Sequence, residues 1–418
     1  MSAPAINQKA WTLLAYTVAD DKGGGDSLDR SAKDELKAIC DAADFGQVSV
    51  AAQVDFKHTR GVFRGTLIAA PPKGRDFEEV RAENHPLWKK ILGNVRQSAL
   101  RVQTERNDLN AARANVLREF LRFGHAECPA ERHVIFFYGH AYGPMGLFYD
   151  AEAKQRAPNT LRLNDLAESL EAVEGRAAVV LFRDCFMNTL ETAYQLRGVA
   201  EFMIASQSVA PIAGIWPWLN FMAALMPGAA SVDVARALAM QLARFLDDPP
   251  NRGPFADVPI ALLDLRTAQE VVAPLKALVA ALEEARHDRR RRTACAKALE
   301  GARVGYPDDP SNPGDPALLD VPTMCDKLAR VDAEAVAVPA RILGEAVRNR
   351  LVSWHHSQKK RYQGTSIYYK PVKPRDLERS YIQAETEEDA ENDSSYYKRL
   401  ALNEATGWHR IALNPLTE

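Results

Sequence analysis

The chain has 418 residues, of which 46% are hydrophobic and 26% charged, values typical of a globular protein with a large core or several domains. Its 53 Lys and Arg nearly balance its 55 Asp and Glu, so charge gives no support for nucleic-acid binding, and no apolar segment is long enough to suggest a membrane span. The five cysteines lack CxxC spacing, which argues against disulfides or a zinc site, so we expect a cytoplasmic protein without metal or cofactor.

Along the chain, patterns typical of strands alternate with patterns typical of helices. Short apolar runs predict strands buried on both faces of a parallel sheet, and alternating runs predict half-buried strands. The predicted strands lie at residues 11–18, 47–56, 61–69, 133–138, 178–182, 201–205 and 258–263. The predicted helices lie at residues 28–43, 109–123, 163–173, 232–246, 266–286 and 333–348. This alternation predicts an α/β fold with a mainly parallel central sheet flanked by helices.

The remaining stretches suggest how the chain is divided. Residues 71–106 are polar and without a clear period, so we expect an irregular connection there. The second half is mostly helical until residues 365–371, which return to a strand pattern. We therefore expect an α/β core at residues 1–264, a helical insertion at 265–364, and a C-terminal strand and closing segment at 365–418 packed on the core.

Two of the predicted strands are followed by residues with reactive side chains. His140 follows the strand at 133–138, and Cys185 follows the strand at 178–182, 185 − 140 = 45 residues later. Neighbouring parallel strands bring their carboxyl ends together, so one crossover helix would set the two side chains facing each other. Asn188 or Thr189 is available to cap a helix after the cysteine, and a thiol near such a helix start is expected to have a lowered pKa.

A thiolate and an imidazole that transfers a proton are the groups that acyl transfer by cysteine requires. A histidine about 50 residues upstream of the cysteine is the caspase arrangement. The residues alone also fit a buried structural cysteine and a structural histidine. The pattern therefore nominates Cys185 and His140 as a catalytic pair and leaves the structural alternative open.

Cys185 is followed by Met187, Glu191 and the Ala193-Tyr194 pair. These residues, at these offsets, resemble the pattern around the catalytic cysteine of the clostripain family of cysteine peptidases. Further similar segments are the strand end and Gly-Trp loop at residues 204–218, the closing strand at 366–371, the C-terminal motif at 397–408 and the first strand at 11–18. The resemblance implies a caspase-like α/β fold and cysteine endopeptidase activity on protein or peptide substrates.

Carried onto this sequence, the resemblance also implies roles for individual residues. Cys185 is the nucleophile, His140 the general acid and base, and the backbone N–H groups of Cys185 and Ala141 form the oxyanion hole. Family members commonly mature by cleavage between the histidine and the cysteine, so we expect a zymogen activated by autocleavage, an upstream protease or a protein partner. The candidate residues of this processing loop are Asp150, Lys154 and Arg156.

The chain departs from the family at the specificity pocket. The family carries an acidic residue two positions before the cysteine, which pairs with Arg or Lys of the substrate, whereas this chain has Arg183. A guanidinium prefers a carboxylate, so we expect basic specificity to be lost and an acidic residue to be preferred. Two alternatives stay open: Asp184 takes the pocket role and retains Arg or Lys preference, or a carboxylate such as Glu191 neutralises Arg183. The candidate pocket residues are Arg183, Asp184, Ser206, Gln207 and Ser208.

Two rival functions remain at this point. The chain could be a catalytically silent member that uses the caspase-like fold as an interaction module. Alternatively, it could retain the cysteine chemistry as a transferase or hydrolase that acts on another acyl substrate. The sequence identifies neither the physiological substrate nor the activation trigger, any calcium dependence or the oligomeric state.

Overall fold

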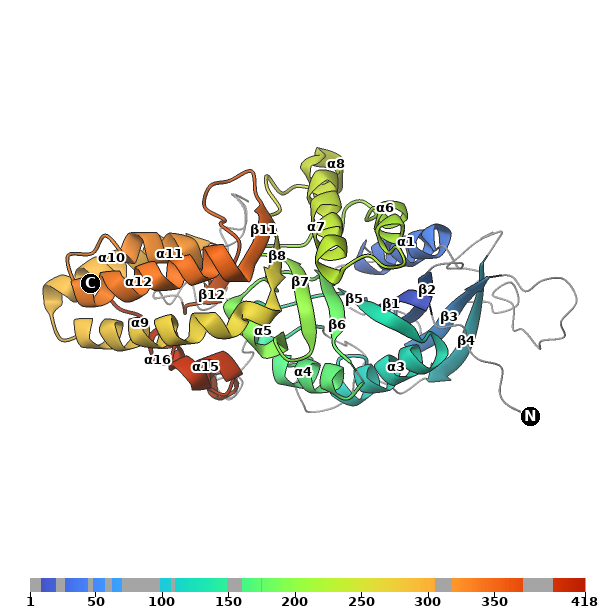
Figure 1. The fold of residues 1–418 in the computed structure, drawn as a ribbon, viewed down its shortest axis with the longest axis horizontal. Helices are drawn as coiled ribbons and strands as arrows, with labels where there is room; N and C mark the ends of the chain where they lie inside the picture. The colour runs from blue at the N-terminus through green and yellow to red at the C-terminus, as the bar shows by residue number, and fades with distance from the viewer. Residues whose placement is uncertain are drawn as a thin grey trace, which may run out of the picture. The chain divides into compact units, whose positions relative to one another are not determined.

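The computed structural model describes residues 9–19, 27–43, 48–56, 62–69, 98–106, 110–148, 160–173, 175–304, 318–370 and 394–417. The chain divides into two compact units, whose elements are labelled in Figure 1. The first unit comprises Met1–His140, Leu147–Arg183 and Pro211–Gly253. The second comprises Ala141–Gly146, Asp184–Ala210 and Pro254–Glu418.

The first unit is built on a mixed sheet with the strand order β6-β5-β1-β2-β3-β4. Its strands are β1 (Lys9–Val18), β2 (Val48–Asp55), β3 (Val62–Ala69), β4 (Ser98–Arg106), β5 (Ala130–Tyr138) and β6 (Ala177–Arg183). The pairings among β2, β1, β5 and β6 are parallel, and those of β3 with β2 and β4 are antiparallel. Every residue of β6 is buried, as expected of an apolar strand covered on both faces.

Helices lie on both faces of this sheet. One face carries α3 (Ala114–Glu127) and α4 (Leu163–Glu171), and the other carries α1 (Ser27–Ala42), α6 (Trp218–Ala224), α7 (Ser231–Asp247) and the short α8 (Pro249–Arg252) (Figure 1). In α3, residues 116, 117, 120, 121 and 124 are buried, so one stripe of the helix packs inward. The predicted α/β class is confirmed.

One predicted connection contains a strand. Residues 98–106 form β4, which pairs antiparallel with β3, although we expected irregular structure throughout residues 71–106. Apolar residues at positions 100 and 102 alternate with polar residues, a period that suits a strand but is too short to stand out among polar neighbours. Residues 71–97 lie outside the described part of the chain.

The second unit contains two sets of paired strands. Strands β7 (Ala200–Ser206), β8 (Ile260–Asp264) and β11 (Val352–His356) pair antiparallel in the order β11-β8-β7. Strands β9 (Arg303–Val304), β10 (Leu318–Asp320) and β12 (Ser366–Tyr368) form the other sheet, in the order β12-β10-β9. The helical elements are η2 (Gly143–Met145), α5 (Leu190–Leu196), η3 (Leu265–Val271), α9 (Val272–Ala285), α10 (Arg289–Glu300), α11 (Val321–Leu328), α12 (Glu334–Ala346), η4 (Val347–Leu351), α15 (Ala401–Thr406) and α16 (His409–Ala412).

The helix after Cys185 begins where its cap predicts. Thr189 is the N-cap of α5, and its side-chain oxygen accepts a hydrogen bond from the Thr192 N–H at 3.2 Å. The helix therefore starts at Leu190, five residues after the cysteine rather than beside it. Among the described residues, none of the helices has the length and apolar character that crossing a bilayer requires.

Candidate active site

The two candidate catalytic residues follow paired strands at the same offset. Strands β5 and β6 run parallel, and their last residues, Tyr138 and Arg183, lie opposite each other. His140 comes two residues after Tyr138, and Cys185 comes two residues after Arg183. The carboxyl end of a parallel strand pair is where open α/β folds place their functional residues.

Cys185 differs from the other cysteines in its exposure. The structure describes all five cysteines, none of which forms a disulfide, and Cys185 alone is partly exposed. The four others are at most 5% exposed: Cys40, Cys128, Cys295 and Cys325. Cys185 is therefore the cysteine that a reactant can approach with the least rearrangement of the protein.

The segment after Cys185 is held against the end of β7 by backbone hydrogen bonds. The Phe186 N–H donates to the Ser208 carbonyl at 2.8 Å, and the Ala210 N–H donates to the Cys185 Sγ at 3.4 Å. Phe186 has a φ of 59°, a left-handed conformation that costs a non-glycine residue about 1–2 kcal/mol. Strain of this kind is retained where the neighbouring contacts enforce it, and here it turns the chain directly after the thiol.

The thiol of Cys185 is not a resting thiolate in this structure. Burial raises the pKa of Cys185 to about 11, the Ala210 N–H lowers it, and the negative charge of Asp184 raises it. We expected the dipole of the following helix to lower this pKa, but α5 begins only at Leu190. Cys185 would therefore need a base that removes its proton before the sulfur could act as a nucleophile.

His140 lies on a backbone that close contacts fix. Its carbonyl accepts a hydrogen bond from the Phe148 N–H at 2.6 Å. A Cβ atom at the preceding residue, Gly139, would lie 2.8 Å from the Phe148 ring and 2.8 Å from the Val18 carbonyl oxygen, so only glycine fits there. The His140 side chain is partly exposed, and Ala141, the expected second oxyanion-hole residue, is buried in the second unit.

Ser206, the last residue of β7, and the two residues that follow it are buried and take part in hydrogen bonds within the second unit. The Ser206 hydroxyl donates to the Val209 carbonyl at 3.2 Å and accepts from the Ser208 N–H at 3.0 Å, which closes a tight turn. The Gln207 side chain donates to Asp320 and to Ser366, both at 3.0 Å, and accepts from the Gly364 N–H at 2.8 Å. Gln207 thus joins this turn to the small β12-β10-β9 sheet, a role that its sequence position did not reveal.

Glu191 makes its contacts within the second unit. It is fully buried, and its Oε1 accepts hydrogen bonds from the Tyr368 N–H at 3.0 Å and the Tyr397 hydroxyl at 2.7 Å. Burial raises the pKa of its carboxyl group, while both hydrogen bonds lower it. Glu191 therefore joins α5 to β12 and to the C-terminal segment and is not the carboxylate that pairs with Arg183.

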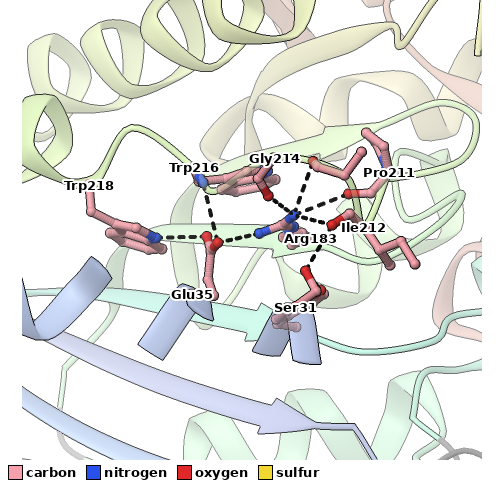
Figure 2. A network of polar contacts seen from close by, with 10 residues as sticks. Ser31, Glu35, Arg183, Pro211, Ile212, Gly214, Trp216 and Trp218 are labelled. Atoms are coloured by element: carbon pink, nitrogen blue, oxygen red, sulfur yellow. Dashed lines mark hydrogen bonds and ion pairs between the residues drawn. The ribbon is translucent and has the colours of Figure 1, made fainter. Parts of the chain in front are cut away.

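Arg183 is buried in a polar network of the first unit (Figure 2). Its side chain is 0% exposed, and its Nη1 forms an ion pair with Glu35 of α1. Its Nη2 donates to the Gly214 carbonyl at 2.9 Å and lies 3.3 to 3.5 Å from the carbonyl oxygens of residues 211–213. The guanidinium thus joins the end of β6 to helix α1 and to the segment that begins at residue 211.

The carboxylate of Glu35 is equally engaged. It accepts hydrogen bonds from the Trp216 N–H at 3.2 Å and the Trp218 Nε1 at 2.7 Å (Figure 2). The guanidinium carbon of Arg183 lies 4.6 Å from the centre of the Tyr138 ring and 5.3 Å from that of the Trp216 ring. In such a buried, aromatic site, each of the two opposite charges is stabilised mainly by the other.

This arrangement argues against the hypothesis that Arg183 offers its charge to a substrate. Its charge is already matched by Glu35, which was not among the candidate residues. The available signal was that Glu35 lies on the apolar face of its helix, between the buried residues Ala32 and Ile39. A carboxylate at such a position requires a buried partner.

The remaining predictions concern the processing loop, Asp184 and metal binding. The processing-loop residues Asp150, Lys154 and Arg156 lie outside the described part of the chain. Asp184 is buried in the second unit and directly precedes Cys185 in the chain. Within the described residues, no group of three or more His, Cys, Asp or Glu is arranged to hold a metal ion.

Three solved structures share this fold. A secreted C11 cysteine protease from Bacteroides thetaiotaomicron, in complex with an irreversible peptide inhibitor, matches with a TM-score of 0.63 and 16% identity. An inactive zymogen C11 protease from Parabacteroides distasonis matches with a TM-score of 0.63 and 17% identity. The secreted B. thetaiotaomicron protease called iotapain matches with a TM-score of 0.64 and 14% identity. Each match covers 96% of this chain and 99% of the other chain.

These matches confirm the predicted caspase-like α/β fold. No curated protein matches the sequence. The family model described as the clostripain family, peptidase C11, matches residues 24–331, which is most of the chain and includes both His140 and Cys185. The chain is a cysteine peptidase that belongs to the clostripain family.

Proposed function

We propose that this peptidase is an endopeptidase in which Cys185 is the nucleophile and His140 transfers the proton. The observation that carries the proposal is the common offset of the two residues from the paired ends of β5 and β6. The partial exposure of Cys185, in contrast to the four buried cysteines, supports the same assignment. Under this proposal, the two residues act together on one peptide bond.

The raised pKa of Cys185 determines how the reaction begins. Because the thiol holds its proton at neutral pH, His140 accepts that proton as Sγ attacks the carbonyl carbon of the substrate. The backbone N–H groups of Cys185 and Ala141 stabilise the oxyanion of the tetrahedral intermediate. His140 then protonates the leaving amine, which yields a thioester, and it removes a proton from the water that hydrolyses this acyl-enzyme.

We further propose that substrate specificity is shifted away from Arg and Lys. Arg183 stands where the family's acidic residue would meet a basic side chain, and the nearby carboxylate of Glu35 is neutralised by Arg183 itself. An acidic substrate gains no free cation from this pair either, because the guanidinium is buried and its Nη1 and Nη2 already meet Glu35 and the carbonyls. The alternative is retained Arg or Lys preference through Asp184, and a peptide library with each residue before the scissile bond distinguishes the two.

The proposal also covers the activation of the peptidase and its location in the cell. We propose that the peptidase is made as a zymogen and matures by cleavage between residues 150 and 160, by its own activity, an upstream protease or a partner. We also propose a cytoplasmic location, for which the five unpaired cysteines are the support. Fractionation of the producing cells tests the location.

The test of the activity compares the wild-type protein with Cys185→Ala and His140→Ala variants. Mass spectrometry of the purified proteins and hydrolysis of a fluorogenic peptide library are measured together. We expect cleavage within residues 150–160 and library turnover for the wild type alone. Turnover that survives in Cys185→Ala would refute the assignment of the nucleophile, and a wild-type protein that never cleaves a peptide would favour the silent module or another acyl substrate.

A further inference from the structure

A closed ring of hydrogen bonds includes the segment that follows Cys185. The Ser206 carbonyl accepts from the Asn188 N–H at 3.1 Å, and the Asn188 carbonyl accepts from the Ser366 N–H at 3.1 Å. The Ser366 hydroxyl in turn accepts from the Gln207 side chain at 3.0 Å. Because Gln207 directly follows Ser206, these bonds close a ring, and all of its members belong to the second unit.

The carboxamide of Gln207 supplies the side-chain part of this ring. Its nitrogen also donates to the Asp320 carboxylate at 3.0 Å, and its oxygen accepts from the Gly364 N–H at 2.8 Å. Asp320 is itself fixed, since it caps α11 by accepting from the Thr323 N–H at 2.9 Å. Gln207 is 1% exposed and Asp320 is 0% exposed, so the carboxamide makes all of these bonds inside the protein.

The neighbours of Gln207 in the chain hold the segment of Cys185. The Ser208 carbonyl accepts from the Phe186 N–H at 2.8 Å, and the Ala210 N–H donates to the Cys185 Sγ at 3.4 Å. The backbone of this turn thus meets the cysteine segment, while the Gln207 side chain meets the β12-β10-β9 sheet. A shift of the turn would therefore move the Ala210 N–H relative to the sulfur.

This N–H group matters for the proposed reaction. Burial raises the pKa of Cys185 and the Ala210 N–H lowers it, because a hydrogen-bond donor stabilises the thiolate more than the thiol. The sulfur must lose its proton to attack a carbonyl carbon, so a donor held on Sγ stabilises the negative charge that develops there. The position of the turn therefore affects the reactivity of Cys185.

We propose that Gln207 is a positioning residue for Cys185: its carboxamide holds residues 206–210 so that the Ala210 N–H stays on the sulfur. The proposal rests on the proposed role of Cys185 as the nucleophile and adds a residue that acts on the thiol only through the backbone. A glutamine suits this role because its amide donates and accepts at once. An ionised carboxylate of the same shape cannot donate and would place a second acidic group beside Asp320.

The test reads the reactivity of the Cys185 thiol without peptide turnover. In the full-length His140→Ala protein, mass spectrometry gives the rate at which iodoacetamide alkylates Cys185 at about pH 9, with and without Gln207→Leu. This substitution removes all three hydrogen bonds of the carboxamide and adds no charge. Because pH 9 lies below the Cys185 pKa of about 11, the rate follows the fraction of thiolate.

The expected slowing follows from the lost hydrogen bond to sulfur. Such a bond to a charged group shifts a pKa by about one to two units, and each unit changes the thiolate fraction about tenfold. A more basic thiolate is also about threefold more nucleophilic per unit, which offsets part of the loss. We therefore expect alkylation to be about three- to tenfold slower in Gln207→Leu. Gln207→Glu, which keeps the acceptor for Gly364 but loses both donors, should be slowed as well.

Asp257→Asn is the matched control. Asp257 is 2% exposed in the same unit, and its carboxylate accepts from the Ser357 hydroxyl and from the N–H groups of Gln358 and Lys359, which belong to a different turn. The substitution should lower the melting temperature, measured by circular dichroism, and leave the alkylation rate of Cys185 unchanged. Such a result separates an effect on the thiol from a general loss of stability.

Two outcomes overturn the proposal. Alkylation of folded Gln207→Leu that is as fast as that of the parent protein, or faster, would do so. A slowing that Asp257→Asn reproduces at the same loss of stability would also do so. Failure of the peptidase function would appear separately, as absence of turnover by the protein with His140 intact, and it would leave the alkylation rates readable.

Discussion

Replacement of Arg183 by methionine perturbs the network of the first unit most directly. The change removes the guanidinium and leaves Glu35, which is 1% exposed, with two N–H donors and no opposite charge in contact. Breaking a buried ion pair by removing one partner costs about 3–5 kcal/mol, and the loss of the donor to the Gly214 carbonyl adds about 1 kcal/mol. We therefore expect the free energy of unfolding of the first unit to fall by about 4–6 kcal/mol.

A double variant separates the charge from the packing. In Arg183→Met/Glu35→Gln, no buried charge remains, and the amide oxygen keeps one of the two hydrogen bonds that the separate Glu35 oxygens accept from Trp216 and Trp218. The double variant should therefore be more stable than Arg183→Met by about 2 kcal/mol, although it carries one more substitution. Such recovery identifies the unpaired carboxylate as the main cause of the loss.

The assay is urea denaturation followed by tryptophan fluorescence, since both indoles of the network report on it. Arg290→Met is the matched control, because its ion pair with Asp332 is exposed and spans 3.7 Å, and it should leave the unfolding midpoint unchanged. A loss below about 1 kcal/mol in Arg183→Met, or a double variant no more stable than the single, would refute the reasoning.

Three further predictions concern other parts of the structure. Gly214→Ala should cost about 2–4 kcal/mol of unfolding free energy, whereas Gly228→Ala, with φ +78° and nothing within 4 Å of the added Cβ, should cost about 1 kcal/mol; equal losses would contradict the steric argument. In a His140→Ala variant, alkylation of Cys185 by iodoacetamide should be slow at pH 7 and rise about tenfold per pH unit up to about pH 11; a plateau near neutral pH would contradict the raised thiol pKa. Burial raises the folded-state pKa of the Glu191 carboxyl group above 4.5, so this group stabilises the folded protein below pH 4.5 and the stabilisation is lost as the pH rises through the folded-state pKa. Glu191→Gln should therefore reduce the loss of stability over that pH range, as measured by denaturation at a series of pH values.

Sequence patterns predicted the parts of the fold that local chemistry dictates. The apolar run of β6 predicts a buried strand, and Thr189 caps the helix that follows Cys185, because both signals lie within a few residues of the element that they specify. Strand β4 was missed because its short alternation lies among polar residues of an otherwise unpatterned stretch.

The site was less predictable, because its contacts join distant segments. Glu35 and Arg183 come from a helix and a strand separated by more than a hundred residues, so no local pattern could show that they form a pair. Gln207 likewise binds Asp320 and Ser366, which are 113 and 159 residues away in sequence. Sequence could nominate Arg183 as unusual, but only the fold reveals which carboxylate it meets.

The most direct test of the account is covalent labelling of the native protein with a peptide that carries a thiol-reactive electrophile, followed by mass spectrometry. The four buried cysteines are internal controls, because each is at most 5% exposed. We expect one added mass, located on Cys185; the labelling should abolish peptide hydrolysis and should be greatly slowed in His140→Ala. Labelling at any other cysteine with loss of activity, or full activity after Cys185 is labelled, would contradict this expectation.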